Sequence, residues 1–220
     1  MIYHNLENVS QNLIRVFVLD PREWVFFFAA VDAELTSTGV VQFSGDLEHL
    51  VHVENKAHSH SRIIAVGELE AIRRAIDLAT SQQQQSQYNI LIIATDNLVA
   101  KRWVEKRVAD NDDANEILRH IFQVMVDHGF HISLLYVPSA DNAADPISRG
   151  RYERNDDQFR RNAATRALLQ QERANWLLQR NSNSDRCQTT QRRSDTAVED
   201  ERSRAGRCLM WEGEDWEEYS

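Results

Sequence analysis

The chain has 220 residues, 42% of them hydrophobic, which is enough for one well-buried domain of about 150 residues plus an additional segment. Residues 1–150 carry 20 Asp and Glu against 12 Lys and Arg, a net charge of −8. This acidity argues against nucleic-acid binding by bulk charge, because phosphate contacts need clustered Lys and Arg, although local basic patches stay open. Without a signal peptide or an apolar run of about 18 residues, we expect an intracellular, soluble protein with no membrane partner.

The N-terminal part of the chain has the pattern of β-strands. Apolar, aromatic and β-branched runs are separated by turn-like breaks. The run that ends at Asp32 should be central, with an antiparallel strand returning after it. Residues 1–12 are polar and are interpreted as an N-terminal extension. The runs are Leu13–Leu19, Trp24–Val31, Gly39–Phe43 and, with looser alternation, Leu47–Val53.

From residue 67 to residue 80 the apolar side chains recur every three or four positions, which is typical of an amphipathic helix. Glu68 lies four residues before Ile72 and so borders the apolar stripe. Glu70 shares its face with Arg73, so we interpret it as a charge on the solvent side. The spacing therefore favours Glu68 over Glu70 as the acid that points into the fold.

A central strand is predicted at Ile90–Thr95, directly before Asp96. A continuous apolar run bounded by polar residues is typical of a strand covered on both faces. Asp96 then lies at the carboxyl end of that strand, the edge at which ligand sites occur in open α/β sheets. The preceding segment, Ser81–Gln87, contains four consecutive Gln and is predicted to be an exposed linker.

The segment Leu98–Arg107 is predicted to be a basic helix around Trp103. In an otherwise acidic domain it is the best local candidate for phosphate contacts. A solvated helix face with a packed Trp is an equal alternative. The four cations of the basic helix are Lys101, Arg102, Lys106 and Arg107.

A second helix at Glu116–His128, ended by Gly129, precedes a strand at His131–Val137. The order of elements predicts an α/β fold with a mixed five-stranded sheet flanked by helices. Four acids occupy comparable places, either near a strand end or at the core side of a helix: Asp32, Glu68, Asp96 and Asp145.

Short motifs around these acids resemble a known family. In chain order they are Val31-Asp-Ala33, Glu68-Leu-Glu-Ala-Ile72, Ala94-Thr-Asp-Asn97 and Asn142-Ala-Ala-Asp-Pro-Ile-Ser-Arg149. Together they resemble the ribonuclease H domain of reverse-transcribing retroelements, and the last motif looks most like that of gypsy-like and DIRS-like retrotransposon polyproteins. The resemblance covers roughly residues 16–149, and we expect a ribonuclease H-like domain at residues 13–150.

The resemblance implies that the four acids are catalytic and bind two Mg²⁺ or Mn²⁺ ions. Clustered carboxylates repel one another, and divalent cations that prefer oxygen ligands supply the counter-charge. Two such ions activate a water and stabilise the leaving oxygen of a phosphodiester. Asp32 would bridge both ions, Glu68 and Asp96 would hold the leaving-group ion, and Asp145 the nucleophile's ion. The implied substrate is the RNA strand of an RNA–DNA hybrid.

Polar residues beside the acids are expected to contact the hybrid. Asn97 or Asn142, with backbone groups, would read the RNA 2′-hydroxyls. Arg149 and the four cations of the basic helix would bind phosphates. Two departures from the family pattern concern the site: no His precedes Asp145 in its loop, and Glu34 stands where a small or hydroxyl residue is usual.

The last third of the chain differs in composition. Residues 151–180 are predicted to contain a helix, Asp157–Arg180, whose first turns would complete the nuclease fold, and residues 181–220 a low-complexity, disordered tail. The acidic and aromatic end at Met210–Tyr219 is a candidate site for a protein partner. An adjacent reverse transcriptase domain is another candidate partner.

Two other functions stay open. The acidic core, the Gln run and the tail favour a catalytically inactive ribonuclease H-like module for interaction or scaffolding, whereas four intact acids favour a nuclease. A related nuclease, such as an integrase or a Holliday-junction resolvase, would share the sheet and the acids. It fits the helix-borne Glu68 and the last motif less well.

Overall fold

The computed structural model describes residues 24–57, 63–86, 88–151 and 155–179. The chain divides into two compact units, residues 1–174 and 175–220, and the sheet and the acids lie in the first unit. The predicted N-terminal extension, the run at Leu13–Leu19 and the tail at residues 181–220 fall outside the described residues. Among the described helices, none is long and apolar enough to cross a membrane.

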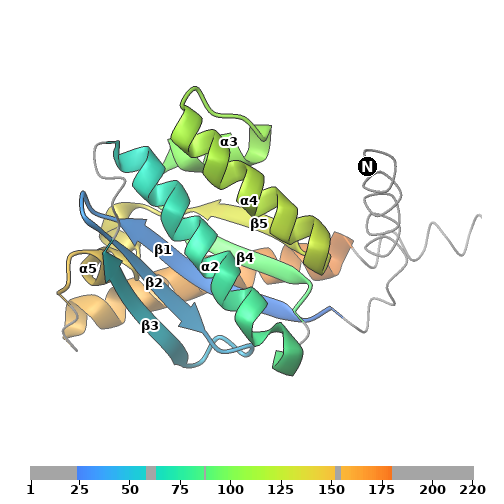
Figure 1. Cartoon of the computed structure of the whole chain (residues 1–220). Coiled ribbons are helices and arrows are strands. Elements are labelled where there is room, and N and C mark those ends of the chain that lie inside the picture. The colour runs from blue at the N-terminus through green and yellow to red at the C-terminus, as the bar shows by residue number, and fades with distance from the viewer. Residues whose placement is uncertain (1–23, 58–62, 87, 152–154, 180–220) are drawn as a thin grey trace, which may run out of the picture. The chain divides into compact units, whose positions relative to one another are not determined.

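The described residues form one mixed sheet of five strands, which confirms the predicted α/β architecture (Figure 1). The strands are β1 (Phe26–Ala33), β2 (Ser37–Phe43), β3 (Leu50–Ala57), β4 (Ile90–Thr95) and β5 (His131–Tyr136). Their order is β3-β2-β1-β4-β5. The β1–β2 and β2–β3 pairs are antiparallel, whereas the β1–β4 and β4–β5 pairs are parallel. Both β1 and β4 are buried at every position, as expected for central strands covered on both faces.

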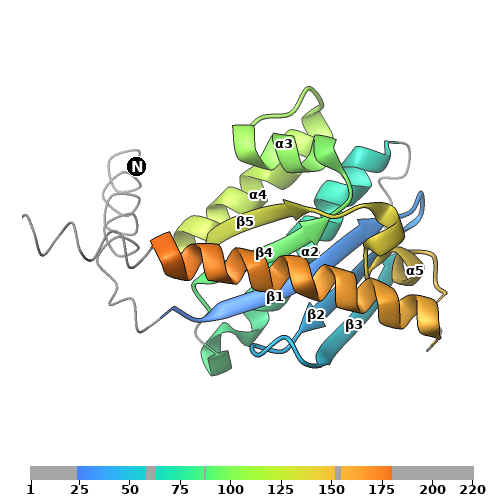
Figure 2. The ribbon, with the colours of Figure 1, turned by 180° about the vertical axis from the view of Figure 1, so that it is seen from behind.

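Helices cover both faces of the sheet. On one face lie α2 (Ile64–Ser86) and α4 (Asp112–His128) (Figure 1). The helix that begins at residue 156 lies across the other face (Figure 2). There Glu172 accepts a hydrogen bond from Ser133 of β5 at 2.7 Å, and the guanidinium of Arg173 lies 5.6 Å from the ring centre of Phe26 in β1. The turns of this helix before residue 175 therefore supply the second covering layer.

The main core lies between the sheet and the helices α2 and α4. Leu69, Ile72 and Ile76 of α2 are fully buried in one cluster with Phe27 of β1 and Ile93 of β4. Each such side chain contributes roughly 1.5–3 kcal/mol by leaving water. The apolar stripe therefore fixes which side of α2 faces the sheet, and with it the direction of the acids on this helix.

Two predictions about α2 are wrong. Glu70, interpreted as facing solvent, is only 5% exposed. Arg73 donates to it at 2.7 and 2.6 Å and Arg74 at 3.2 Å, so its charge is neutralised where it is buried. The four consecutive Gln lie within α2 rather than in a linker, because Gln is a good helix former. Gln82 also exchanges two amide hydrogen bonds with Gln42 of β2, at 2.8 and 3.0 Å.

The short helix α5 (Asp145–Ser148) packs against the β1–β2–β3 side of the sheet. Ser37 donates a hydrogen bond to the carbonyl of Ser148 at 2.5 Å, and Asn55 donates to the same carbonyl at 3.0 Å. These donors satisfy a carbonyl at the end of α5 that has no partner within the helix. Gly39 permits the close approach, because a Cβ there would lie 2.6 Å from the main-chain nitrogen of Ser148.

Replacing Gly39 by Ala should destabilise the protein by about 1–3 kcal/mol, because the new methyl group would press on the backbone of α5. Urea unfolding followed by circular dichroism measures the change. Gly45→Ala is the matched control, since a Cβ on Gly45 would meet no atom of the described residues within 4 Å. Equal stability of the two variants would contradict the close packing of α5 on β2.

Candidate metal site at the edge of the sheet

Three acids meet at the carboxyl ends of β1 and β4. The two strands are parallel and in register, so Asp32 and Asp96 emerge next to each other. In the sheet, Asp32 of β1 pairs with Gly39 of β2. The helix α5, which begins at Asp145, packs against Gly39, so Asp145 comes close to Asp32. One carboxylate oxygen from each of Asp32, Asp96 and Asp145 lies within 4.8 Å of the other two. We refer to these residues as the three-acid cluster.

Glu68, the fourth predicted acid, is buried beside the three-acid cluster but is not a member of it. Its Oε1 accepts a hydrogen bond from the main-chain nitrogen of Ala33 at 3.1 Å. Its Oε2 is buried and meets no donor at hydrogen-bond geometry among the described residues, although the nearby side chain of Thr95 lowers the pKa of the carboxyl against the larger effect of burial. A buried carboxylate oxygen without a donor is costly, and either a proton or a cation relieves that cost.

Burial and mutual repulsion raise the pKa values of Asp32, Glu68 and Asp145. Burial, followed by the charge of Asp96, raises the pKa of Asp32 to about 8. Burial, followed by the charges of Asp32 and Asp96, raises the pKa of Glu68 to about 9. The pKa of Asp145 is also raised, chiefly by burial, although Arg149 and Arg161 oppose the shift. Near neutral pH, Asp32 and Glu68 therefore need either protons or a cation.

The donor set fits a hard divalent cation. Each member of the three-acid cluster offers a carboxylate oxygen, the ligand that Mg²⁺, Mn²⁺ and Ca²⁺ prefer in proteins. The unpartnered Oε2 of Glu68 lies in the same buried environment and fits the same kind of ion. The residues present could therefore hold a divalent metal ion at this edge of the sheet.

Two polar side chains support the cluster in ways that the sequence did not reveal. The hydroxyl of Ser148 donates to the carboxylate of Asp32 and lies 2.9 Å from the main-chain oxygen of Asp145. Asn142 was predicted to read nucleic acid, and this is wrong because it is fully buried. Its Nδ2 donates to the backbone of β1 at 2.9 Å, and its Oδ1 accepts from Ala144 at 3.0 Å. Asn142 instead fixes the loop that carries the third acid.

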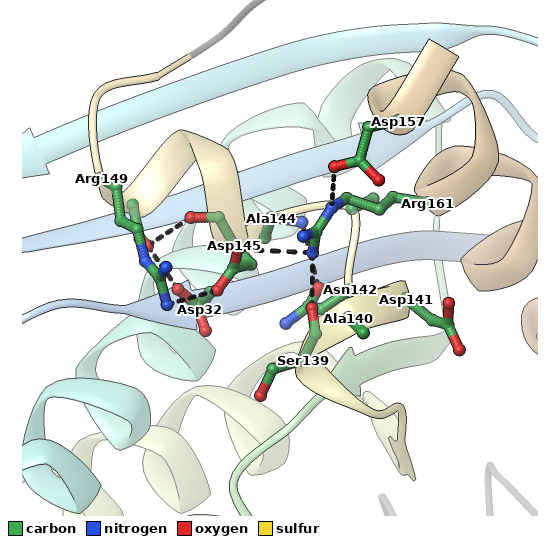
Figure 3. Close-up of polar contacts among 12 residues, drawn as sticks. Asp32, Ser139, Ala140, Asp141, Asn142, Ala144, Asp145, Arg149, Asp157 and Arg161 are labelled. Carbon is green, nitrogen blue, oxygen red and sulfur yellow. Dashed lines mark hydrogen bonds and ion pairs between the residues drawn. The ribbon is translucent and has the colours of Figure 1, made fainter. Parts of the chain in front are cut away.

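Two arginines bind the carboxylate of Asp145 from different directions (Figure 3). Arg149 Nη2 lies 2.7 Å from Oδ1, and Arg161 Nη1 lies 3.3 Å from Oδ2. Arg149, predicted to bind phosphate, also lies 3.5 Å from Glu34, so the extra charge of Glu34 faces a cation. Arg161 was not predicted as a site residue. Arg161 follows Asp157 by four residues, so the sequence indicates an ion pair between them on one helix. Nothing in the sequence indicates its contact with Asp145.

The predicted basic helix is present as α3 (Leu98–Lys106), which begins just after β4. Asn97, predicted to contact RNA, caps its N-terminus through Oδ1. Trp103 packs against the core, as in the alternative prediction, whereas Arg102 and Lys106 are exposed one turn apart. The other two cations contact the protein itself: Lys101 pairs with Glu105, and Arg107 lies 5.5 Å from the ring centre of Phe122.

Comparisons with known proteins find similarity only to solved structures, at low sequence identity. A scan against protein-family models finds no match, and a search of curated proteins finds no relative. Ribonuclease H1 from Halobacterium salinarum matches at 18% identity over 57% of this chain and 96% of its own, with a TM-score of 0.48. The N-terminal RNase H domain of a Mycobacterium tuberculosis protein matches at 15% identity over 59% and 100%, also at 0.48.

A third solved structure, the protease–reverse transcriptase of prototype foamy virus, is 14% identical over 63% of this chain and 22% of its own, with a TM-score of 0.43. With TM-scores below 0.5 and identities below 20%, these three matches carry no argument about the function of this chain. The strand order and the contacts of the acids define the fold and the site of this chain.

Metal-free protein should lose stability as the pH rises from about 5 to about 9. The folded-state pKa values of Asp32 and Glu68, about 8 and about 9, exceed their ordinary values of 3.8 and 4.5. The folded state therefore binds protons that the unfolded state releases, and the stability contributed by these protons is lost across that interval. Urea unfolding in EDTA measures the trend, and excess Mg²⁺ or Mn²⁺ should reverse it.

Glu68→Gln should flatten this pH dependence because it removes one of the titrating groups. Asp110→Asn is the control, since Asp110 lies in an exposed loop. A Glu68→Gln variant with the same slope as the parent would contradict the assigned electrostatics.

Proposed function

We propose that this chain is a metal-dependent endonuclease of the ribonuclease H type, which hydrolyses the RNA strand of an RNA–DNA hybrid. One observation carries the proposal: three carboxylate oxygens within 4.8 Å of one another at the carboxyl ends of two central parallel strands, with Glu68 buried beside them. The order of the sequence motifs around the same acids supports the same class. The proposed retroelement origin rests on those motifs alone.

The four acids are proposed to hold two Mg²⁺ or Mn²⁺ ions. When bound, such ions supply an activated water and stabilise the leaving oxygen. The protein's own contribution is to fix the ligand atoms in advance. Ser148 holds one oxygen of Asp32 by a hydrogen bond, and Asn142 ties the loop before Asp145 to the backbone of β1. Partners of this kind orient metal ligands and tune their affinity.

Nucleic-acid binding is proposed to use α3 and Arg149. Arg102 and Lys106 are exposed on a helix that begins directly after Asp96, and this exposure supports the proposal that they bind phosphates of the uncut strand. RNA would be distinguished from DNA through its 2′-hydroxyls, by backbone groups and Asn97. An adjacent reverse transcriptase domain, or a protein bound by the tail, remains a proposed partner.

A catalytically inactive interaction module is the second candidate, because one observation favours it. Both carboxylate oxygens of Asp145 are already paired with arginines, so the protein itself neutralises this acid. The unpartnered Oε2 of Glu68 and the presence of all four acids favour the nuclease.

Purified protein should cut the RNA strand of a labelled RNA–DNA hybrid in Mg²⁺ or Mn²⁺. Asp96→Asn should lower the rate about a hundredfold or more, because it removes a ligand of an ion that stabilises the transition state by several kcal/mol. Asp110→Asn, in an exposed loop, should cut like the parent. Folded protein that cuts nothing in either metal would contradict the nuclease proposal, and cutting of DNA junctions alone would indicate a related nuclease.

Removing both exposed cations of α3, Arg102→Ala with Lys106→Ala, should weaken hybrid binding without altering the metal site. Each lost phosphate contact should reduce the slope of log affinity against log salt by about one. Fluorescence anisotropy with an uncleavable hybrid, over a series of salt concentrations, measures the slope. Arg119→Ala on α4 is the control, since Arg119 is exposed on a different helix. An unchanged slope in the double variant would rule out α3 as the phosphate contact.

A further inference from the structure

The carboxylate of Asp145 has a cation on each oxygen. Arg149 binds Oδ1 at 2.7 Å and Arg161 binds Oδ2 at 3.3 Å (Figure 3). Asp145 is nevertheless one of the three acids whose oxygens converge within 4.8 Å. For Asp145 to ligate a metal ion, one of its two arginines must therefore share or release its oxygen.

The two arginines are held very differently. Arg161 is only 15% exposed in its side chain, and besides Asp145 it donates from Nη1 to the carbonyl of Ser139 at 2.6 Å and from Nε to Asp157 at 2.9 Å. If it left, the buried carboxylate of Asp145 would lose a charge-assisted partner, whereas the carbonyl of Ser139 and the carboxylate of Asp157 are exposed and could bind water instead. Arg161 is therefore held by Asp145 at the start of α5, by the carbonyl of Ser139 and by Asp157 of its own helix.

Arg149 is far less constrained. Its side chain is 47% exposed, and its second partner, Glu34, is 45% exposed and lies 3.5 Å away. The pair with Glu34 is exposed on both sides and is worth only about 0–1 kcal/mol. The side chain of Asp145 is 8% exposed, so the guanidinium can move into water only when another cation replaces it on Oδ1.

We propose that Arg149 is an exchangeable cation on Asp145, whereas Arg161 is a positioning residue that stays. A divalent cation and Arg149 compete for Oδ1, while Arg161 keeps the carboxylate in place through Oδ2. This inference rests on the proposed metal-dependent function. A divalent ion repels the guanidinium beside it, so metal binding releases Arg149 toward solvent. There the guanidinium can bind a phosphate group of the substrate through charge-assisted hydrogen bonds.

The consequence is a coupling between metal and phosphate binding. Release of Arg149 by the metal favours phosphate binding, and by reciprocity a phosphate that captures Arg149 favours metal binding. The same exchange separates the two candidate functions: with Arg149 on Asp145 the acid is neutralised, and with Arg149 released the acid is free to act as a ligand.

The test is a titration of the whole protein with Mn²⁺ and no nucleic acid, following free Mn²⁺ by electron paramagnetic resonance. Arg149→Gln should bind Mn²⁺ at least roughly twofold more tightly than the parent, because a cation that competes for Oδ1 of Asp145 is gone. Arg149→Lys should stay close to the parent. Arg161→Gln should bind Mn²⁺ more weakly, and Arg161→Lys should recover part of the loss. Arg160→Gln is the control, since exposed Arg160 pairs with Asp141 and Asp157 rather than with Asp145.

Opposite effects at the two arginines are the signature of the proposal, since simple removal of positive charge would tighten Mn²⁺ binding at both. Unchanged or weaker binding in Arg149→Gln, with binding intact in the parent, overturns the exchange. If the Arg161→Gln variant fails to fold, Arg161→Lys takes its place: it keeps the charge, so a charge effect alone would leave Mn²⁺ binding unchanged, whereas the proposal expects weaker binding than in the parent. No saturable Mn²⁺ binding in the parent, or equal binding in Asp96→Asn, would instead overturn the metal site and the exchange together.

Discussion

The mutual repulsion of buried carboxylates is the constraint on which this structure depends. Asp32, Asp96 and Asp145 present oxygens within 4.8 Å of one another, and like charges repel more strongly in a poorly solvated site than in water. Side chains on flexible loops would move apart. Here two acids are fixed on neighbouring parallel strands, and the third is held by α5, which packs on the bare backbone of Gly39. The fold therefore maintains a concentration of charge that a cation can relieve.

The cations that the protein itself supplies are distributed unevenly around this charge. Asp145 has two arginines, whereas the Oε2 of Glu68 has no hydrogen-bond partner among the described residues, and Asp32 receives a hydroxyl donor from Ser148. Glu68 and Asp32 consequently have less compensation than Asp145, and burial is the largest cause of the raised pKa of both. A divalent ion placed among the acids would remove this imbalance, and a purely structural role for the cluster leaves it unexplained.

The elements that carry the acids could be predicted from the sequence because their burial leaves a periodic pattern. The apolar run at Ile90–Thr95 marks a strand covered on both faces, and the stripe of α2 identifies Glu68 as facing inward. Periodicity does not report which distant side chain will cover a polar group. Glu70 therefore looked exposed although two arginines bury it, and Asn142 looked available although the backbone of β1 holds it. The contact of Arg161 with Asp145 depends on how a helix crosses the sheet, which no local pattern records.

The central claim is that the three-acid cluster is a divalent metal site. The most direct test is a crystal of the metal-free protein soaked in Mn²⁺, with anomalous difference maps collected for the parent and for Asp96→Asn. We expect anomalous density bounded by Asp32, Asp96 and Asp145 in the parent, and its loss or weakening in the variant. Ordered carboxylates in the parent with no anomalous density among them, or Mn²⁺ bound only elsewhere on the protein, would contradict the account.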